Sequence, residues 1–529
     1  MPSPASNSPV SISPAESVPS PAAPAAATGK ETYGQILKSS VLIGGSSAFN
    51  VAIGIVRTKA MALLLGPAGF GLMGLYTSVA NLAQSTAGMG VNSSGVRQIA
   101  AAVGSGDAEC IARTATVLRR VSAVLGLLGA ALLVVLSRPV SMLTFGSYER
   151  ATPVALLSLA VLFRTVSDGQ GALIQGLRRI SELATIAVLG GLFGTVVSVA
   201  LVYLLGERGV VPSLIASAGI SLLFSWWFSR RVGFETPALS ASHVSQEAGA
   251  LLKLGFAFMA SAMLAMGAAY AVRIMIVRQI GFEAAGLYQS AWTIGGLYVG
   301  FILQAMGADF YPRLTAVVRN HHECNRLVTE QAEVSLLLAG PGVIATLTFA
   351  PLVISLLYTS AFGEAVDVLR WICLGATLQV ITWPMGFIIV AQGRQAIFFW
   401  SEFAYTVIHL GLAWVFVTHL GVNGAGMAFF ASYAFHGLMV YPIVRWLTGF
   451  RWSAANRRLA IVFLPLIGVV FCSFYILPFW LATVVGALAA LLSAVYSARV
   501  LGRLISADRV PRPIQRLLAW AGITPRGRP

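Results

Sequence analysis

The sequence predicts an all-α polytopic membrane protein, with two six-helix lobes related by a pseudo-twofold axis along the membrane normal and a C-terminal helical hairpin, about 14 transmembrane helices in total. Its composition, the length of its apolar runs and an internal repeat support this prediction. Of the 529 residues, 57% are hydrophobic and 10% are charged, and the mean hydropathy is +0.80. A soluble protein carries roughly 25% charged residues, so this composition excludes a water-soluble globular protein.

Apolar runs of about 20 residues, the length that crosses a bilayer as a helix, recur along nearly the whole chain. Only helices and closed barrels satisfy the backbone inside a bilayer, and these runs are too long and too uniformly apolar for barrel strands. We therefore predict fourteen helical spans, with approximate limits at 38–65, 72–103, 117–136, 151–176, 183–205, 210–229, 252–280, 286–311, 330–357, 364–391, 397–419, 424–444, 459–477 and 480–500.

The first half of the chain recurs in the second half. Residues 66–72, GPAGFGL, return 215 positions later as GFEAAGL at 281–287, and Gly206 returns as Gly421. Each copy contains six spans, and because six is even, both copies enter the membrane from the same side. We expect the copies to form two lobes with a cavity between them, and the last two spans to lie outside the repeat as an added hairpin.

The repeat divides the chain into four expected segments. Residues 1–29 consist mainly of Pro, Ala and Ser, which cannot bury a core, so they are predicted to be a disordered tail. They lack the basic and apolar regions of a secretory signal. Residues 30–235 are expected to form the N-lobe and 236–448 the C-lobe, and 449–529 to hold two extra helices and a basic cytoplasmic tail.

The basic residues indicate how the spans are oriented. Loops of one parity hold only Arg138, Arg150 and Arg208. Lysines and arginines gather instead in the N-terminal segment, the loops of the other parity and the C-terminal tail, so the positive-inside rule places both termini in the cytoplasm. This bias also explains the net charge of +16, and because the basic residues are not gathered on one soluble domain, no nucleic-acid partner is expected.

Two arginines stand at matching positions inside predicted spans, Arg57 in the first and Arg273 in the seventh. Each lies roughly 12 Å inside the outer end of its span at about 1.5 Å per residue. A cation there costs at least about 2.5 kcal/mol unless it faces water, an anion or a partner. We interpret Arg57, its neighbour Lys59, and Arg273 as a cationic cavity wall for an anionic substrate. The alternative is snorkelling to the outer interface, which runs against the charge bias of that side.

Arg97 and Arg313 form a second matching pair, at the cytoplasmic ends of the second and eighth spans. They could bind an anionic head group at the inner mouth of the cavity. They could equally be ordinary anchors that follow the positive-inside rule. In the first case, the four arginines would form a ladder that suits a doubly charged pyrophosphate.

Three acidic residues within spans are candidates for ion coupling: Asp168, Asp309 and Glu402. Asp168 follows Arg164 by four residues on one helix face, so the pair either neutralises itself in the bundle or forms a titratable coupling site. Asp309 precedes Arg313 by four residues and allows the same two interpretations. Glu402 has no partner nearby in the sequence. It either binds a proton or a sodium ion, or lies close to the cytoplasmic interface.

The sequence carries no enzyme signature, and we predict no catalytic residue, metal site or cofactor. It contains neither a Walker A lysine motif nor a Gly-x-Ser-x-Gly motif, and a membrane-embedded glycosyltransferase would need a larger outer loop than any found here. The cysteines lack CxxC or metal-ligand spacing and are expected to be reduced structural thiols. Energy for transport would come from an ion gradient, the membrane potential or the substrate gradient.

Several short motifs together give the chain a family resemblance. They are VRTK at 56–59, LGPAGFG at 65–71, SSGVRQIA at 93–100, QGLRR at 175–179, GLYQ at 286–289 and MGADFYPRL at 306–314. With these motifs the chain resembles the O-antigen translocase, or polysaccharide flippase, family of the multidrug, oligosaccharidyl-lipid and polysaccharide exporter superfamily. The resemblance covers about 33 to about 450 and is specific only for the set as a whole.

The resemblance implies a V-shaped bundle in the bacterial inner membrane. The implied substrate is a polyprenyl-pyrophosphate-linked oligosaccharide, an O-antigen or exopolysaccharide repeat unit, moved from the cytoplasmic to the periplasmic leaflet by alternating access. Implied partners are membrane lipid, a polysaccharide polymerase and a chain-length regulator of lipopolysaccharide or related synthesis. The head-group role of the family's cationic cavity residues would fall to Arg57, Lys59, Arg97, Arg273 and Arg313.

Two other transport functions on the same scaffold remain open. The last two spans lie beyond the twelve-helix core usual for the family, which leaves kinship with fourteen-helix relatives that flip the peptidoglycan precursor. A multidrug cation exporter would want unpaired acidic residues and aromatic side chains in its cavity, whereas this sequence offers arginines.

Overall fold

The computed structural model describes residues 29–233 and 241–504, and every regular element in these ranges is a helix. Side chains are described from residue 45 onward, except within 234–246 and at some positions between 250 and 309. The first helices are α1 (Gly29–Gly88), α2 (Val91–Ser105), α3 (Ala108–Val135), α4 (Ser137–Phe145), α5 (Ala151–Gly176), α6 (Ile180–Leu205), η1 (Gly206–Gly209) and α7 (Val210–Arg230). They are followed by α8 (Ala241–Gln279), α9 (Phe282–Ala316), α10 (His321–Thr348), α11 (Ala350–Leu357), η2 (Ser360–Phe362), α12 (Ala365–Ala391), α13 (Gln395–Leu420), α14 (Asn423–Thr448), α15 (Ala454–Ile476) and α16 (Phe479–Leu504).

The helices confirm the prediction of an all-α multi-pass membrane protein. Ten helical stretches among the described residues are long and apolar enough to cross a membrane, and one of them, Ile180–Arg230, contains two predicted spans as α6 and α7. The expected spans 252–280 and 286–311 correspond to α8 and α9. The prediction of one continuous span over 72–103 is wrong, because positive φ angles at Met89 (43°) and Gly90 (67°) separate α1 from α2.

The repeat predicted from the sequence is present in the backbone. Gly206 has φ 57° and ψ −137°, and its counterpart Gly421 has φ 65° and ψ −151°, so both helices α6 and α13 end in the same left-handed turn. The helices that follow two matching loops of the repeat also begin alike. The Asp107 carboxylate accepts from the backbone of Glu109 and Cys110, and Asn320 caps α10 in the same way.

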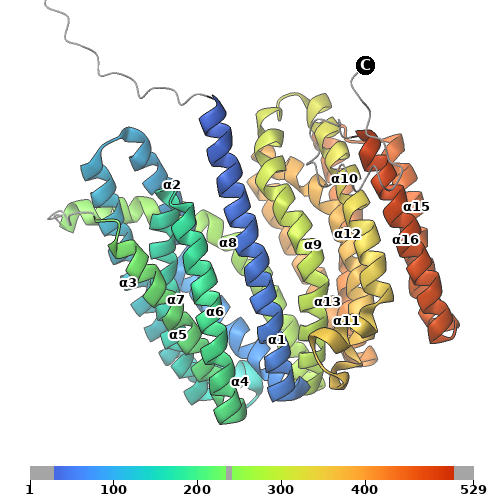
Figure 1. Ribbon diagram of the computed structural model, residues 1–529, viewed down its shortest axis with the longest axis horizontal. Helices are drawn as coiled ribbons and strands as arrows, with labels where there is room; N and C mark the ends of the chain where they lie inside the picture. Colours follow the sequence, from blue (N-terminus) through green and yellow to red (C-terminus); the bar gives the residue numbers. More distant parts are fainter. Residues whose placement is uncertain (1–28, 234–240, 505–529) are drawn as a thin grey trace, which may run out of the picture.

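The two copies of the repeat form two lobes. We call α1–α7 the N-lobe and α8–α14 the C-lobe. Figure 1 shows α2–α7 on one side of the molecule and α9–α14 on the other, with α1 and α8 between them. The hairpin of α15 and α16 lies beyond the C-lobe, against α10. A Cβ atom at Gly340 of α10 would overlap the Phe463 ring, and one at Gly486 of α16 would overlap Thr348, so small residues allow this close packing.

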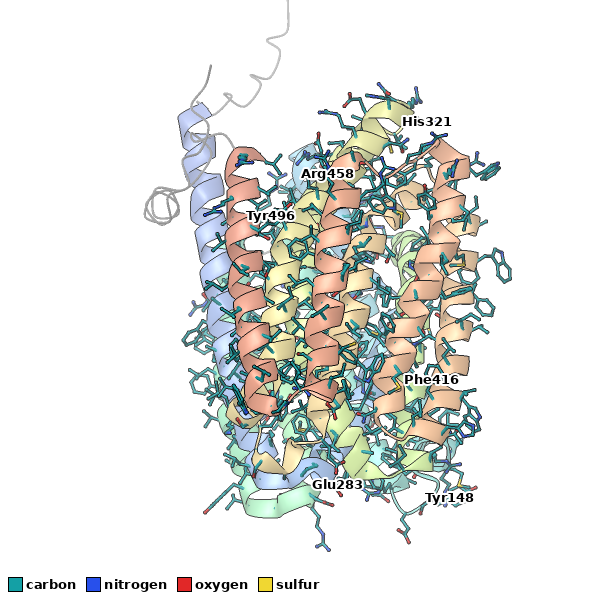
Figure 2. All side chains as sticks on the ribbon, turned by 90° about the vertical axis from the view of Figure 1, so that its right-hand side faces the viewer. Tyr148, Glu283, His321, Phe416, Arg458 and Tyr496 are labelled. Carbon is teal, nitrogen blue, oxygen red and sulfur yellow. The ribbon has the colours of Figure 1, made fainter. Side chains whose placement is uncertain are left out.

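The two ends of the bundle differ in chemistry. Figure 2 shows His321 and Arg458 at one end, which we call the basic end, and Tyr148 and Glu283 at the other, which we call the opposite end. Helix α1 begins and α16 finishes at the basic end (Figure 1), as an even number of crossings requires. The lobes cross near the opposite end, where a Cβ atom at Gly71 of α1 would overlap the Phe282 carbonyl of α9, and one at Gly286 would overlap the Pro67 carbonyl. Gly71 and Gly286 are repeat equivalents, so the pseudo-twofold axis passes close to this contact.

Candidate functional site

The interior of the N-lobe holds two neighbouring arginines from different helices. Arg57 of α1 and Arg164 of α5 are partly buried and close enough for their charges to repel. Arg164 donates through Nη1 to Asn81 Oδ1 at 2.7 Å. Among the described residues, Arg57 has no hydrogen-bond or ion-pair partner. The N-lobe therefore keeps one arginine whose charge no described residue compensates.

Asp168 lies one turn beyond Arg164 but does not neutralise it by direct contact. Gln84 of α1 donates to Asp168 Oδ2 at 2.6 Å, while Arg164 bonds Asn81 on the same helix. The two charges attract through space, yet no ion pair within 4.0 Å joins them. Both charged groups are thus held by neutral amides of α1, which is costly inside a membrane unless water or a ligand completes their solvation.

The C-lobe arginine is held more tightly than its N-lobe counterpart. Arg273 of α8 is only 9% exposed, and it donates to Gln289 Oε1 at 2.7 Å and to the Ala269 carbonyl at 2.8 Å. Its guanidinium also lies 5.9 Å from the centroid of the Tyr288 ring. The repeat equivalent of Gln289 is Gly74, and a Cβ atom there would stand 3.2 Å from the Gln289 side chain. Gln289 therefore fills the space at Gly74, and Arg57 lacks the amide that Arg273 has.

The remaining basic candidates lie elsewhere. Arg97 of α2 and Arg313 of α9 are exposed. The residues that line the two cavities described below include none of the four arginines Arg57, Arg97, Arg273 and Arg313. Lys59 reaches across the lobe boundary, where its Nζ donates to the carbonyls of Ser355, at 2.9 Å, and of Tyr358. These carbonyls close the end of α11, where the negative end of a helix dipole favours a cation.

The Lys59 contact has a counterpart in the other direction. Arg278 of α8 donates through Nη1 to the Met142 carbonyl in the last turn of α4, at 3.3 Å. The first segment of α1, which ends at a kink at Gly66, is the repeat equivalent of α8, and α4 is the repeat equivalent of α11. Each lobe thus sends one cation to the C-terminal carbonyls of the short helix of the other lobe. We call this pair of contacts the latch; it lies at the opposite end of the bundle (Figure 1).

Two cavities open on either side of α8. The N-lobe cavity, of about 430 Å³, is lined by Asn81, Gln84 and Asp168 together with Met266 of α8. The C-lobe cavity, of about 360 Å³, is lined on the α8 side by Ala265 and nearby small residues. Helix α8 also touches the N-lobe at Gly255, which packs against Gly90 without room for a side chain. The two cavities are therefore neighbours, and α8 contributes residues to the lining of both.

The C-lobe cavity has a different chemistry from the N-lobe cavity. Its wall is aromatic, with Trp292 of α9, Trp383 of α12 and Tyr405 of α13, and it contains Glu402. Glu402 Oε1 lies 3.7 Å from Nε2 of His436 on α14. The predicted coupling candidate Glu402 thus has a partner 34 positions away in the sequence (436 − 402), which spacing along one helix could not reveal.

Several residues of this interior were not predicted from the sequence. Asn81, Gln84 and Gln289 hold charged groups, and His409 and His436 lie in the middle of apolar helices. A polar or titratable residue in an apolar span is itself a signal of function, and the two histidines carried that signal. The side chain of Asp309, the third coupling candidate, lies outside the described residues.

These features describe a membrane transporter fold of two pseudo-symmetric lobes with a charged interior. The model of a family described as polysaccharide biosynthesis protein matches residues 60–367, which is more than half of the 529-residue chain. The chain therefore belongs to this polysaccharide biosynthesis protein family.

Individual proteins extend the likeness beyond the matched segment. The chain is 23% identical over 416 residues to the lipid III flippase of Escherichia coli (strain K12), covering 75% of this chain and 95% of that protein. Its fold matches an inward-facing multidrug resistance MATE family transporter of the MOP superfamily, with a TM-score of 0.61 and 18% identity over 76% of this chain and 95% of that one. It also matches the lipid II flippase MurJ in an inward closed conformation, with a TM-score of 0.61 and 12% identity over 88% of this chain and 100% of that one.

Proposed function

We propose that this protein is a flippase that moves a polyprenyl-pyrophosphate-linked oligosaccharide, an O-antigen or exopolysaccharide repeat unit, from the cytoplasmic to the periplasmic leaflet by alternating access. The observation that carries the proposal is the pair of interior arginines on repeat-equivalent helices, Arg57 and Arg273, neither of which contacts a carboxylate of the described residues. The family match and the similarity to a lipid III flippase support the same class of substrate.

The chemistry of such a substrate fits this interior. A pyrophosphate with attached sugars cannot cross hydrocarbon unaided, because its charges and hydroxyls would lose their hydration. Arginine binds phosphate oxygens through paired N–H groups, and the interaction is stronger than a neutral hydrogen bond. Arg57 is the group that gains most from an arriving anion, since Arg164 repels it and no described residue pairs with it. Arg273 would supply the second contact from the other lobe.

In this proposal, the structure is the conformation in which the space between the lobes is closed at the end that holds the latch. If the positive-inside rule holds, the basic end with Arg458 faces the cytoplasm and the latch end faces the periplasm. The latch then closes the outer end of the space between the lobes, and the substrate would enter from the cytoplasmic leaflet. Release to the periplasm would require Lys59 and Arg278 to leave their carbonyl partners.

Two rival functions share the scaffold. A multidrug exporter would attract cationic drugs, and the interior arginines oppose this. A peptidoglycan-precursor flippase carries the same pyrophosphate, and the hairpin of α15 and α16 gives this chain more than the twelve helices usual for polysaccharide flippases. The arginines cannot separate the two precursors, so the sugar must be identified by experiment.

The test is complementation of a deletion strain, with surface polysaccharide measured by gel and membrane levels matched. We expect the wild type to restore surface polysaccharide and Arg57→Ala/Arg273→Ala to lose most of it, because truncation leaves the anion unpaired at a cost of about 3 kcal/mol or more. The control is Arg138→Ala/Arg208→Ala, which removes two exposed arginines from the opposite end. Restoration by the double interior variant would remove these arginines from the transport path. Unchanged polysaccharide with drug sensitivity or with lysis in the deletion strain would favour the exporter or the peptidoglycan function.

A further inference from the structure

The C-lobe contains a titratable cluster that the binding of a pyrophosphate does not use. Glu402 and Tyr405 come from α13, and His436 and Tyr433 come from α14. The carboxylate of Glu402 is 36% exposed and borders the C-lobe cavity, whereas the side chain of His436 is 8% exposed. One member of the pair therefore meets the cavity, and the other is enclosed by protein.

The walls of this cluster isolate the pair from other charges. The Tyr405 ring packs edge-on against His436 with centroids 5.3 Å apart, and the Tyr433 ring lies 5.9 Å from the same imidazole. Helices α8 and α12 line the cavity mainly with small or apolar residues. Helix α12 also contributes Gln379 and Trp383, and α9 contributes the buried phenol Tyr288. Arg273 lies beside Tyr288, and its guanidinium is already bonded to Gln289.

A second buried histidine, His409 of α13, already has a hydrogen-bond partner and is not part of the pair. His409 Nδ1 lies 2.9 Å from Ser432 Oγ, and its ring stacks on Tyr405. By contrast, Nδ1 of His436 is buried without a hydrogen-bond partner. The Nε2 atom of His436 therefore faces Glu402, while its Nδ1 atom has no hydrogen-bond partner among the described residues. Of the two residues, Glu402 is the one that borders the cavity.

The N-lobe has nothing equivalent at these positions. The repeat counterparts of Glu402 and His436 are Ala187 and Ser221, and Gly190 stands in place of Tyr405. Conversely, the N-lobe pair Arg164 and Asp168 corresponds to Gln379 and Trp383 in the C-lobe. At these positions the two lobes therefore differ: the N-lobe carries an arginine and an aspartate, and the C-lobe carries a carboxylate and an imidazole.

We propose that Glu402 and His436 form a proton-binding site through which a proton gradient drives transport. This inference rests on the proposed function and names its coupling ion. A sodium ion, like other hard cations, is best held by several oxygen ligands, whereas the closest partner of this carboxylate is a nitrogen. Within the described residues, no group of three or more His, Cys, Asp or Glu side chains gathers to hold a metal ion.

The coupling step is the uptake of one proton by the pair. Without a proton, the pair consists of a carboxylate and a neutral imidazole; with one proton, it consists of a carboxyl group and a neutral imidazole. Neutralising Glu402 removes the charge that faces Nε2 of His436, and both residues lie on the two helices that also carry Tyr405 and Tyr433. A change in the packing of α13 against α14 would follow, within the lobe that also holds Arg273.

The test uses the full chain in proteoliposomes with a fluorescent polyprenyl-pyrophosphate-linked disaccharide. We expect an imposed pH gradient, but not a sodium gradient, to accelerate transport by the wild type. Glu402→Gln and His436→Asn are expected to lose this acceleration while retaining exchange without a gradient, which also shows that they are folded. His419→Asn, in the exposed last turn of α13, is the matched control and should keep the acceleration.

The outcomes separate this inference from the proposed function. If the wild type moves no substrate under any condition, the proposed function fails. If it moves substrate but responds only to sodium, or if Glu402→Gln keeps the acceleration by a pH gradient, or if Asp168→Asn alone abolishes it, the coupling site is wrong. Infrared difference spectra of the full chain in lipid need no substrate. A carboxyl band that titrates with pH, disappears in Glu402→Gln and titrates at a different pH in His436→Asn would support the site, and an unchanged band in both variants would overturn it.

Discussion

At the scale of single residues, the two interior arginines differ because a neighbouring side chain gives one of them a hydrogen-bond partner. Arg57 and Arg273 occupy matching positions, but Gln289 holds Arg273 while Gly74 stands at the equivalent place beside Arg57. The matching positions could be predicted from the sequence. The difference in their partners could not, because it depends on which side chain projects across the helix crossing.

A residue-scale prediction concerns Arg178, an exposed non-glycine residue with φ of 58°. Its repeat counterpart is Gly393, with φ of 69°. Because a left-handed conformation costs an L-residue about 1–2 kcal/mol, Arg178→Gly should stabilise the fold by about 0.5–1 kcal/mol after the entropy of glycine is counted. Thermal unfolding of the purified protein should shift upward by about one or two degrees.

The control for this prediction is Arg178→Ala, which removes the same charge but keeps the unfavourable backbone angle. It should unfold at or below the temperature of the wild type. Equal stabilisation by both variants would mean that the charge, and not the backbone conformation, was responsible.

At the scale of helices, the crossing of α1 and α9 is the contact that joins the lobes. The sequence predicted both helices and the repeat that contains Gly71 and Gly286, because apolar length and repeated motifs are properties of one segment at a time. It did not predict that these two glycines meet. It also overestimated the second span, since the break at Met89 and Gly90 is a backbone feature without a proline to mark it.

An element-scale prediction follows from the space at this crossing. Gly286→Ala should destabilise the protein by about 1–3 kcal/mol, because the added carbon meets backbone atoms of α1 that cannot rotate away. Gly296→Ala, on the same helix with nothing within 4 Å, is the matched control and should have little effect. The fraction that remains monodisperse after heating in detergent measures both. If both variants lost a similar monodisperse fraction, the cause would be substitution anywhere in helix α9, and the close contact at Gly286 would not be responsible.

At the scale of the whole molecule, the latch joins the two lobes at the opposite end of the bundle. Lys59 was predicted to hold substrate, and that role remains a prediction; in this structure its Nζ contacts the end of α11. Arg278 makes the equivalent contact with α4. A cation at a helix C-terminus contributes about 0.3–1 kcal/mol, so the two contacts together favour the arrangement in which the lobes meet at the opposite end by about 1.4 kcal/mol, or roughly tenfold in population.

The prediction at this scale is that Lys59→Met/Arg278→Met increases the population open at that end by about tenfold. Spin labels at Glu149 and Glu364, exposed residues of the N-lobe and C-lobe, measure the separation once the accessible Cys110 and Cys472 are replaced by serine. The double variant should add a longer distance to the distribution. Lys59→Arg/Arg278→Lys keeps both charges and should retain the wild-type distances; an unchanged distribution in the methionine variant would show that the latch does not control the outer end.

The sequence by itself determined the membrane class, the duplicated fold and the positions of the interior charges, because hydropathy, repetition and loop charge are read along one dimension. The tertiary structure alone decided which charges have partners. Gln84 meets Asp168, Gln289 meets Arg273 and Glu402 meets His436 only after helices have been rotated and packed against one another. Inside a membrane an unpaired charge is costly, so these pairings decide which cation is left for an anion and which carboxylate is left for a proton.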